Sequence, residues 1–166
     1  MSNPYTNSGE PKLRDLKGNL WRLEEDCWID THVTGQPFRI MALPEPGEDA
    51  DPLSVSVERT NGGRMYFKKG YICDGSSIPL LGRWLDNRVS AWPGLVHDAK
   101  HEAMRAGELG PERFVPAASL YRDMMRAFGS FWITSRLCFV GLWLLGRSSA
   151  SPGRGAEYAL RKARAK

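Results

Sequence analysis

The stretch Asp74-Gly75-Ser76-Ser77-Ile78-Pro79 divides this chain into two halves of different character. Residues 21–73, before it, are rich in turn residues and in short runs of alternating apolar and polar positions, which is typical of strands. The residues after it show the three- and four-residue spacing of amphipathic helices. Asp and Ser side chains bond to nearby backbone, Gly permits unusual φ, and Pro79 ends the turn. We therefore expect the hexapeptide to be a hinge between a sheet and a set of helices.

Four short strands are expected in the first half, at residues 28–33, 38–41, 54–57 and 64–67. The first two flank the turn Gly35-Gln36-Pro37, and the last two flank Asn61-Gly62-Gly63. Each pair therefore has the form of a β-hairpin.

Three helices are expected in the second half. The first runs from about residue 92 to Ala106, because a proline at position 93 suits the first helical turn and Gly107 suits the end. The second begins near Ala117 and carries apolar side chains at helical spacing, at positions 117, 120, 121, 124, 125 and 128. The third is the apolar run 131–146. The sequence thus predicts an α+β fold, in which a small N-terminal antiparallel β-sheet precedes a three-helix C-terminal bundle.

The length and composition fit one domain with flanking segments. A chain of 166 residues with 42% apolar and 10% aromatic residues can build one hydrophobic core. We expect a polar N-terminal arm at 1–20, a single α+β domain at 21–146, and a basic C-terminal tail at 147–166. Within the domain, residues 21–73 would form the sheet, and 74–146 would form the motif turn and the helices.

The sequence carries no sign of export. Cys27, Cys73 and Cys138 lie far apart, with none of the spacing of a zinc ribbon or a disulfide framework, so a reducing compartment is expected. The first residues, Met1 to Tyr5, contain no basic region followed by an apolar run, so no signal peptide is expected.

Positive charge is concentrated at the C-terminal end. The whole chain has a net charge of +4, whereas the residues from Arg147 onward carry six Lys/Arg against one acid, Glu157. A short basic tail without interleaved aromatic residues is more typical of a solvated end than of a nucleic-acid site. We therefore expect no specific nucleic-acid partner.

The run 131–146 is apolar on nearly all sides. It is shorter than the roughly 20 residues that span a bilayer and it contains Arg136, so we expect a buried core helix and no transmembrane helix. The alternative is an interfacial helix that seats Trp132 and Trp143 in a lipid surface or a partner's groove.

Two histidines mark a candidate site on the helix that begins near residue 92. His97 and His101 are four residues apart, so they lie on one side of the helix, as two zinc-binding imidazoles do. His-Asp-Ala-Lys-His resembles H-E-x-x-H, with Asp98 in the position of the Glu. Asp74 is the natural third ligand, and the metal would be zinc or calcium. Alternatively, both histidines are solvated surface residues.

Asp123 is the fourth candidate residue. A carboxylate that accepts a hydrogen bond from one imidazole nitrogen fixes the tautomer, so Asp123 could orient His97 from the neighbouring helix. Otherwise it is a charged residue at the rim of an amphipathic helix. Catalysis by Ser76 or Ser77 is not favoured, because the pattern G-x-S-x-G is absent.

The segment 69–79, the pair His97-Asp98 and Asp123 together resemble a domain family of bacteriophages and prophages whose function is unknown. That family has the pattern G-[FY]-x-[TS]-D-[GL]-A-S-I-P, followed by H-D-x-x-Y and then A-D-x-x-F. The resemblance covers roughly Gly70 to Gly146.

The same family pattern is similar to the helical hairpin of phospholipase A2-like enzymes. That similarity implies a catalytic base at His97, a metal ligand at Asp98 and an orienting carboxylate at Asp123. The chain departs from the pattern in having His101 in place of Tyr and Arg122 in place of Ala, and no G-x-G calcium loop precedes the helix.

Two functions are consistent with these residues. One is a small metal-assisted hydrolase of an ester or amide, in a lipid or a cell-wall component, with His97 as base and Asp74, Asp98 and His101 at the metal. The other is a non-enzymatic virion or host-interaction protein in which the His/Asp cluster is a buried structural network. Helix 131–146 would then meet virion subunits or a second copy of the chain, in the host cytoplasm or the virion. An open cleft over His97 would favour the first function, and a sealed cluster would favour the second.

Overall fold

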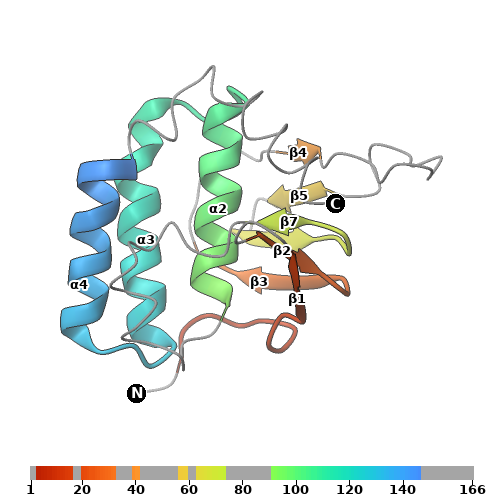
Figure 1. Ribbon diagram of the computed structural model, residues 1–166, viewed down its shortest axis with the longest axis horizontal. Coiled ribbons are helices and arrows are strands. Elements are labelled where there is room, and N and C mark those ends of the chain that lie inside the picture. Colours follow the sequence, from red (N-terminus) through yellow and green to blue (C-terminus); the bar gives the residue numbers. More distant parts are fainter. Residues whose placement is uncertain are drawn as a thin grey trace.

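A computed structural model describes residues 3–16, 20–32, 39–41, 56–59, 63–73 and 91–146. The expected hinge at residues 74–79 and the basic tail at 147–166 lie outside the described residues. The described part consists of strands followed by three α-helices, as Figure 1 shows. This order confirms the α+β fold, with an N-terminal antiparallel sheet and a C-terminal set of three helices.

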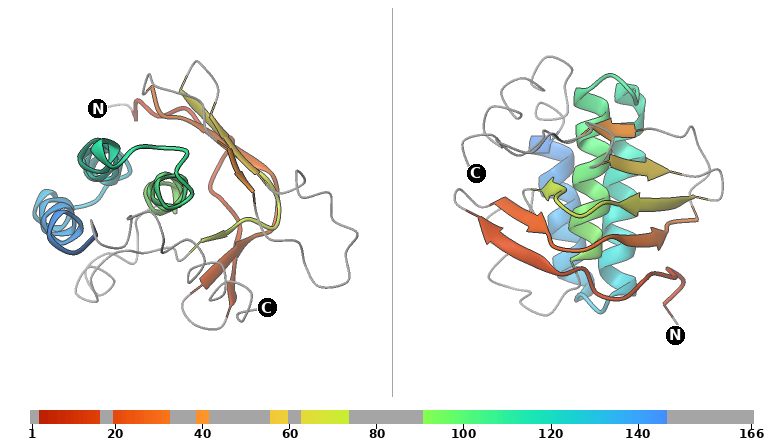
Figure 2. Two further views of the ribbon diagram at one scale, coloured as in Figure 1. Left: turned by 90° about the horizontal axis from the view of Figure 1, so that it is seen from above. Right: turned by 90° about the vertical axis from the view of Figure 1, so that its right-hand side faces the viewer.

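The strands of the described part form two antiparallel sheets. The first has the order β1-β2-β7, made of Leu13–Leu16, Leu20–Leu23 and Ile72–Cys73. The second has the order β3-β6-β5-β4, made of Cys27–Asp30, Arg64–Phe67, Ser56–Arg59 and Arg39–Met41. All three helices lie on the same side of these strands (Figure 2).

One of the two expected hairpins is present. β5 pairs with β6 in antiparallel register, with Val57 opposite Phe67, although β5 lies two residues later than predicted. The expected hairpin of 28–33 with 38–41 is wrong, because β3 pairs with β6 and β4 pairs with β5. The alternation of buried and more exposed residues along each strand explains the observed pairing. Ile29 of β3 and Phe67 of β6 are both buried, so the two strands present one continuous apolar face to the helices.

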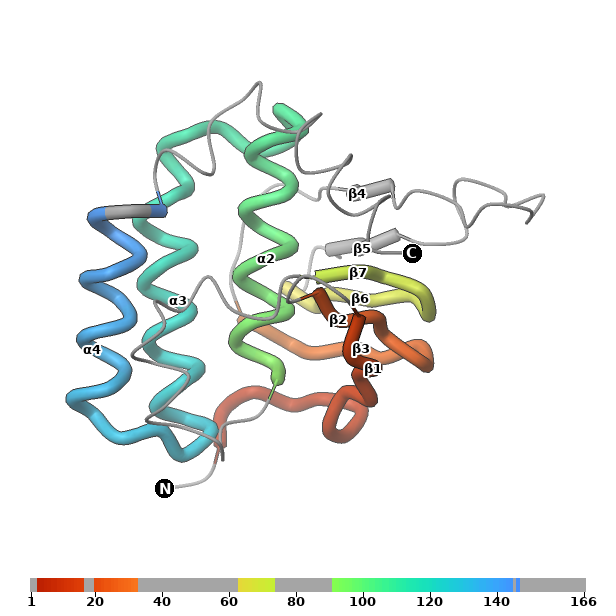
Figure 3. The backbone as a smooth tube through the Cα atoms, in the orientation of Figure 1, coloured from red at the N-terminus to blue at the C-terminus, as the bar shows by residue number. Residues whose placement is uncertain are grey.

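The N-terminal arm contributes to both layers. Ser8 N donates to Trp28 O over 3.0 Å, so the arm runs along the free edge of β3. Trp92 Nε1 donates to Gly9 O over 2.9 Å, and Ala91 N donates to Glu10 Oε1 over 2.7 Å, so the arm also holds the start of the first described helix. Figure 3 shows this segment crossing the lower end of the helices on its way to the sheet. Residues 3–16 are therefore tied to the domain and include a strand of their own, β1.

The helices are α2 (Trp92–Arg105), α3 (Phe114–Ala127) and α4 (Trp132–Gly141). A short 3-10 turn, η1 (Pro111–Arg113), precedes α3, and a π-helical turn, η2 (Leu142–Gly146), continues α4. The expected ends of α2 are confirmed to within a residue: Pro93 lies in its first turn, and Gly107 follows its end with a φ of 79°. A positive φ strains any residue with a Cβ, which is why glycine ends this helix.

The helices form successive layers away from the sheet (Figure 2). α2 packs directly on the strands, α3 packs on α2, and α4 packs on α3. The main core lies between the strands and α2, where Phe67 and the fully buried Trp92 meet edge to face with ring centroids 6.1 Å apart. α2 is thus covered on both sides, and eleven of its fourteen residues are buried.

Burial predicts that all three cysteines are unreactive in the native protein. Each is at most 7% exposed, and burial raises the pKa of the Cys27 thiol to about 12, with smaller contributions from Asp26 and Glu25. We expect a thiol reagent at pH 8 to label no cysteine in native protein and three after unfolding in denaturant, because only the thiolate reacts. Rapid labelling of a native thiol would contradict this burial.

The raised pKa of Cys27 also implies that the contribution of its neutral thiol to the free energy of unfolding is complete below about pH 9 and is lost as the pH rises toward 12.

Candidate functional site

Three predicted site residues come together inside the molecule. His97, Asp98 and His101, hereafter the histidine cluster, lie on consecutive turns of α2 and are only 1%, 3% and 0% exposed. The burial follows from the position of α2 between the sheet and α3, which leaves the helix no solvated face over these turns. The alternative of two solvated surface histidines is therefore wrong.

The two imidazoles pack against aromatic rings of α3. The His97 and His101 ring centroids are 3.9 Å apart, at an interplanar angle of 45°. His97 meets Tyr121 edge-on with a centroid distance of 5.1 Å, and His101 lies 5.4 Å from the ring of Phe114. The four rings form one contiguous group of tilted and edge-on contacts between α2 and α3, which contributes dispersion and quadrupole interactions to the packing of the two helices.

The end of η2 lies against this group of rings. A Cβ built on Gly146 would lie 3.2 Å from Phe114 Cζ and 3.5 Å from His101 Cε1. The backbone of Gly146 therefore approaches the rings more closely than another residue could without displacing Phe114. Three separate elements, α2, α3 and η2, thus enclose His101.

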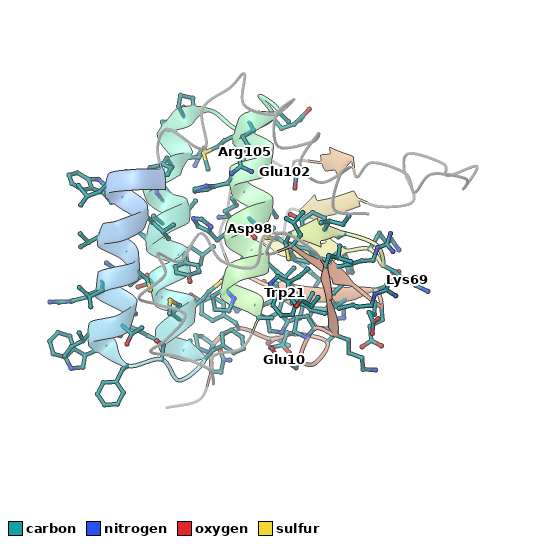
Figure 4. All side chains as sticks on the ribbon, in the orientation of Figure 1. Glu10, Trp21, Lys69, Asp98, Glu102 and Arg105 are labelled. Carbon is teal, nitrogen blue, oxygen red and sulfur yellow. The ribbon has the colours of Figure 1, made fainter. Side chains whose placement is uncertain are left out.

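Asp98 makes a weak contact within the cluster. Its Oδ1 lies 3.4 Å from His97 Nδ1, which is near the outer limit for a hydrogen bond. Adjacent residues on a helix point about 100° apart, so His97 and Asp98 do not share a face. Figure 4 shows the labelled Asp98, Glu102 and Arg105 in succession along the part of α2 nearest the strands.

A second polar link lies between α2 and the sheet. The hydroxyl of Tyr71, which is 1% exposed, donates to Glu102 Oε2 over 3.1 Å. Glu102 is one helical turn beyond Asp98, so both carboxylates belong to the same side of α2. None of the four residues Tyr71, Glu102, Tyr121 and Phe114 was predicted as a site residue. The i, i+4 spacing of Asp98 and Glu102 was the available signal.

Asp123 does not join the histidine cluster. Its side chain is 49% exposed, and its Oδ1 accepts hydrogen bonds from Arg122 Nη2 and Nε over 2.8 and 2.9 Å. Asp123 also faces the N-terminal arm: the pKa of Tyr5 is raised, first by burial and then by the charge of Asp123. The reason is helical geometry, because Tyr121 faces His97 and a residue two positions later points about 200° away. The structure thus places Tyr121 where the orienting carboxylate was expected.

The remaining predicted site residues lie outside the described part of the chain. They are Asp74, Gly75, Ser76, Ser77 and Pro79. The last described residue before them is Cys73, at the end of β7, which packs against α2. Among the residues that the structure describes, no group of three or more His, Cys, Asp or Glu side chains could hold a metal ion.

A second candidate site is the outward side of α4 and η2, the last helical segment in the described part of the chain. Seven large apolar side chains there are 47% to 74% exposed: Phe131, Trp132, Ile133, Leu137, Val140, Trp143 and Leu144, hereafter the apolar face. The expectation of a buried core helix at 131–146 is therefore wrong. The reason is the layer order, because α4 is outermost and only α3 covers it in the described part of the molecule (Figure 2). No helix in that part is both long and apolar enough to cross a bilayer.

Small and polar residues form the inner side of α4. Thr134, Ser135 and Cys138 are buried, and Cys138 packs with Ala118 and Tyr121 of α3. Ser135 Oγ donates to Trp132 O over 2.9 Å, which satisfies a hydroxyl that would otherwise be costly to bury. The helix thus reverses the usual arrangement, with its hydroxyl groups inside and its largest apolar side chains outside.

Comparisons with known proteins yield no relatives. The chain matches no family model, no curated protein and no solved structure.

Truncation within the histidine cluster is expected to destabilise the protein. His101→Ala leaves a cavity between α2, α3 and η2 and should lower the free energy of unfolding by about 2–4 kcal/mol in urea titration. His101→Leu refills most of that volume and should cost less. Asp123→Asn serves as the control and should change stability by less than about 0.5 kcal/mol, because its partner Arg122 is also solvated. Equal effects of His101→Ala and Asp123→Asn would show that the cluster does not hold the helices together.

Proposed function

We propose that this chain is a non-enzymatic docking protein that works through the apolar face of α4. The observation that carries the proposal is the reversed arrangement of that helix, with seven large apolar side chains outside. Soluble proteins rarely expose a contiguous apolar patch of this kind unless another surface covers it during function. None of these seven side chains belongs to the main core between the sheet and α2.

The burial of the histidine cluster supports the same proposal. A catalytic imidazole needs access for a substrate or a water molecule, whereas His97 and His101 are at most 1% exposed and packed between aromatic rings. A buried polar group that contacts side chains of two helices favours one relative placement of those helices over others. The cluster is therefore best understood as a structural network that aligns α2 with α3.

The resemblance of Gly70–Pro79, His97-Asp98 and Asp123 to a phage and prophage family suggests where the docking takes place. In this proposal the protein is a component of a phage virion or a protein that a phage directs against its host. Mass spectrometry of purified particles would separate these two roles, because only a virion component stays with the particle.

Site-specific cross-linking tests the docking function. A photoreactive amino acid at Leu137, which is 58% exposed on α4, should yield a discrete adduct when cells that make the protein are irradiated. The matched control is the same substitution at Val115, which is 47% exposed on α3 outside the apolar face. We expect adducts at Leu137 at least about 10-fold more abundant than at Val115, because a docked face excludes water and holds its partner close. Equal yields at Leu137 and Val115, counting adducts to lipid as well as to protein, would refute the proposal.

The second candidate function is a metal-assisted hydrolase of an ester or amide bond. It is favoured by one specific observation: His97 and His101 lie side by side with ring centroids 3.9 Å apart, and Asp98 adjoins them. Asp74, which follows the end of β7 in the chain, would complete the ligands of a zinc or calcium ion. Such an ion would lower the pKa of a bound water molecule and so supply the nucleophile.

Metal content decides between the two functions. The docking proposal predicts that protein purified without chelator contains well under one zinc or calcium per chain, and that neither ion raises the melting temperature. One ion per chain, lost in His97→Ala but retained in Asp123→Asn, would instead establish the metal site. The control variant is suitable because Asp123 is exposed and bonded to Arg122, away from His97.

A further inference from the structure

We propose that the apolar face of α4 docks on the surface of a lipid bilayer rich in anionic lipids. This inference rests on the docking function proposed above and names its partner. Three features of the last third of the chain favour a lipid surface: the placement of the tryptophans, the position of one arginine, and the distribution of charge.

The tryptophans lie near the two ends of the apolar face. Trp132 begins α4 and Trp143 lies in η2, and both indoles are more than half exposed. Tryptophan is the side chain that settles at the boundary between lipid headgroups and acyl chains. Ile133, Leu137 and Val140 lie between them on the exposed side. In α4 the exposed residues fall within an arc of about 140° at 3.6 residues per turn, so a helix lying in the plane of the membrane could insert all of them together.

Arg136 stands in the middle of this apolar face. Its guanidinium lies 5.5 Å from the centroid of the Trp132 ring, and the residue is exposed. At a bilayer surface the long stem of arginine can lie among apolar side chains while its charge reaches the headgroups. In a two-fold dimer formed through the same face, Arg136 would approach its own symmetry copy, and two like charges would oppose association. The position of Arg136 thus favours a lipid surface over a second copy of the chain.

The charge of the chain changes sign before α4. Residues 124–166 contain eight Lys/Arg and one acid, Glu157, for a net charge of +7. Residues 1–123 contain 15 Lys/Arg and 18 Asp/Glu, for a net charge of −3. The basic tail starts at Arg147, immediately after η2. A polybasic segment next to an interfacial helix is attracted to anionic headgroups, and the two interactions together hold a protein that either alone would bind only weakly.

Vesicle binding by the full-length chain tests this inference directly. Flotation is measured with vesicles of phosphatidylcholine alone and with vesicles that contain phosphatidylglycerol at one part in three. We expect binding to the anionic vesicles to be about 100-fold or more tighter, because the tail alone brings a net charge of +5 to the surface. Raising the salt concentration should weaken binding, since screening acts on the charges and not on the apolar contacts.

Matched variants assign the binding to the face and to the tail. L137Q and W143Q should each weaken binding to anionic vesicles by about 10-fold, whereas V115Q, an apolar-to-Gln change on α3, should not. R161Q, K162Q and R164Q together should abolish the preference for anionic lipid. The control that removes the same charge is K12Q, K68Q and K69Q, on the strand half of the chain, and it should leave the preference intact. The comparison of vesicle compositions with the unaltered protein stands even if a variant fails to fold.

Four results would overturn the inference. They are no binding to anionic vesicles, equal binding to both compositions, an effect of V115Q as large as that of L137Q, and unchanged binding after loss of the three tail charges. If the chain does not bind vesicles while Leu137 still cross-links to a protein partner, the proposed lipid partner is wrong but the docking function stands. If neither vesicles nor a cross-link are found, both proposals fail together.

Discussion

The enclosure of α2 between the sheet and α3 is the constraint on which the rest of the structure depends. The strands bury Trp92 and the apolar side of α2, and α3 covers the opposite side with Tyr121 and Phe114. A helix with no solvated face must place every polar side chain against another element. Glu102 accepts a hydrogen bond from Tyr71 on the sheet side, and the imidazoles pack against aromatic rings on the α3 side. His97 and His101, which the sequence suggested as site residues, are therefore part of the packing between α2 and α3.

Local signals in the sequence predicted the three helices and both ends of α2. They did not predict the start of α3, which lies three residues before the expected Ala117, or what each strand pairs with. Pro93 and Gly107 mark α2 because they act through their own backbone, and such effects need no tertiary partner. The partner of β3 depends instead on which apolar faces align, and β6 lies far along the chain from it. The pairing of β1 with β2 was missed because residues 1–20 are polar overall, and edge strands show weak hydrophobic alternation.

The candidate site was predictable in part. The i, i+4 spacing of His97 and His101 correctly placed the two imidazoles together, since that relation belongs to one helix. The predicted role of Asp123, to orient His97, was wrong because it depended on which side of α3 faces α2. The apolar stripe of α3 already contained Tyr121, and the stripe is the side that packs on α2, so a residue two positions later had to point elsewhere. The similarity to the helical hairpin of phospholipase A2-like enzymes did not show which side of α3 faces α2.

The reversed arrangement of α4 shows why an apolar composition does not by itself predict burial. Its inner side places Ser135 and Cys138 against α3, and the apolar contact there is made mainly by Cys138, Leu142 and part of Phe139. The exposed part of the apolar side chains, 47% to 74% of each of the seven residues of the apolar face, adds no burial to the stability of the isolated chain. A surface that bound the apolar face only in the folded helix would, by linkage, stabilise α4, and by more the tighter it bound. Folding of α4 and binding at its outer face would therefore increase together.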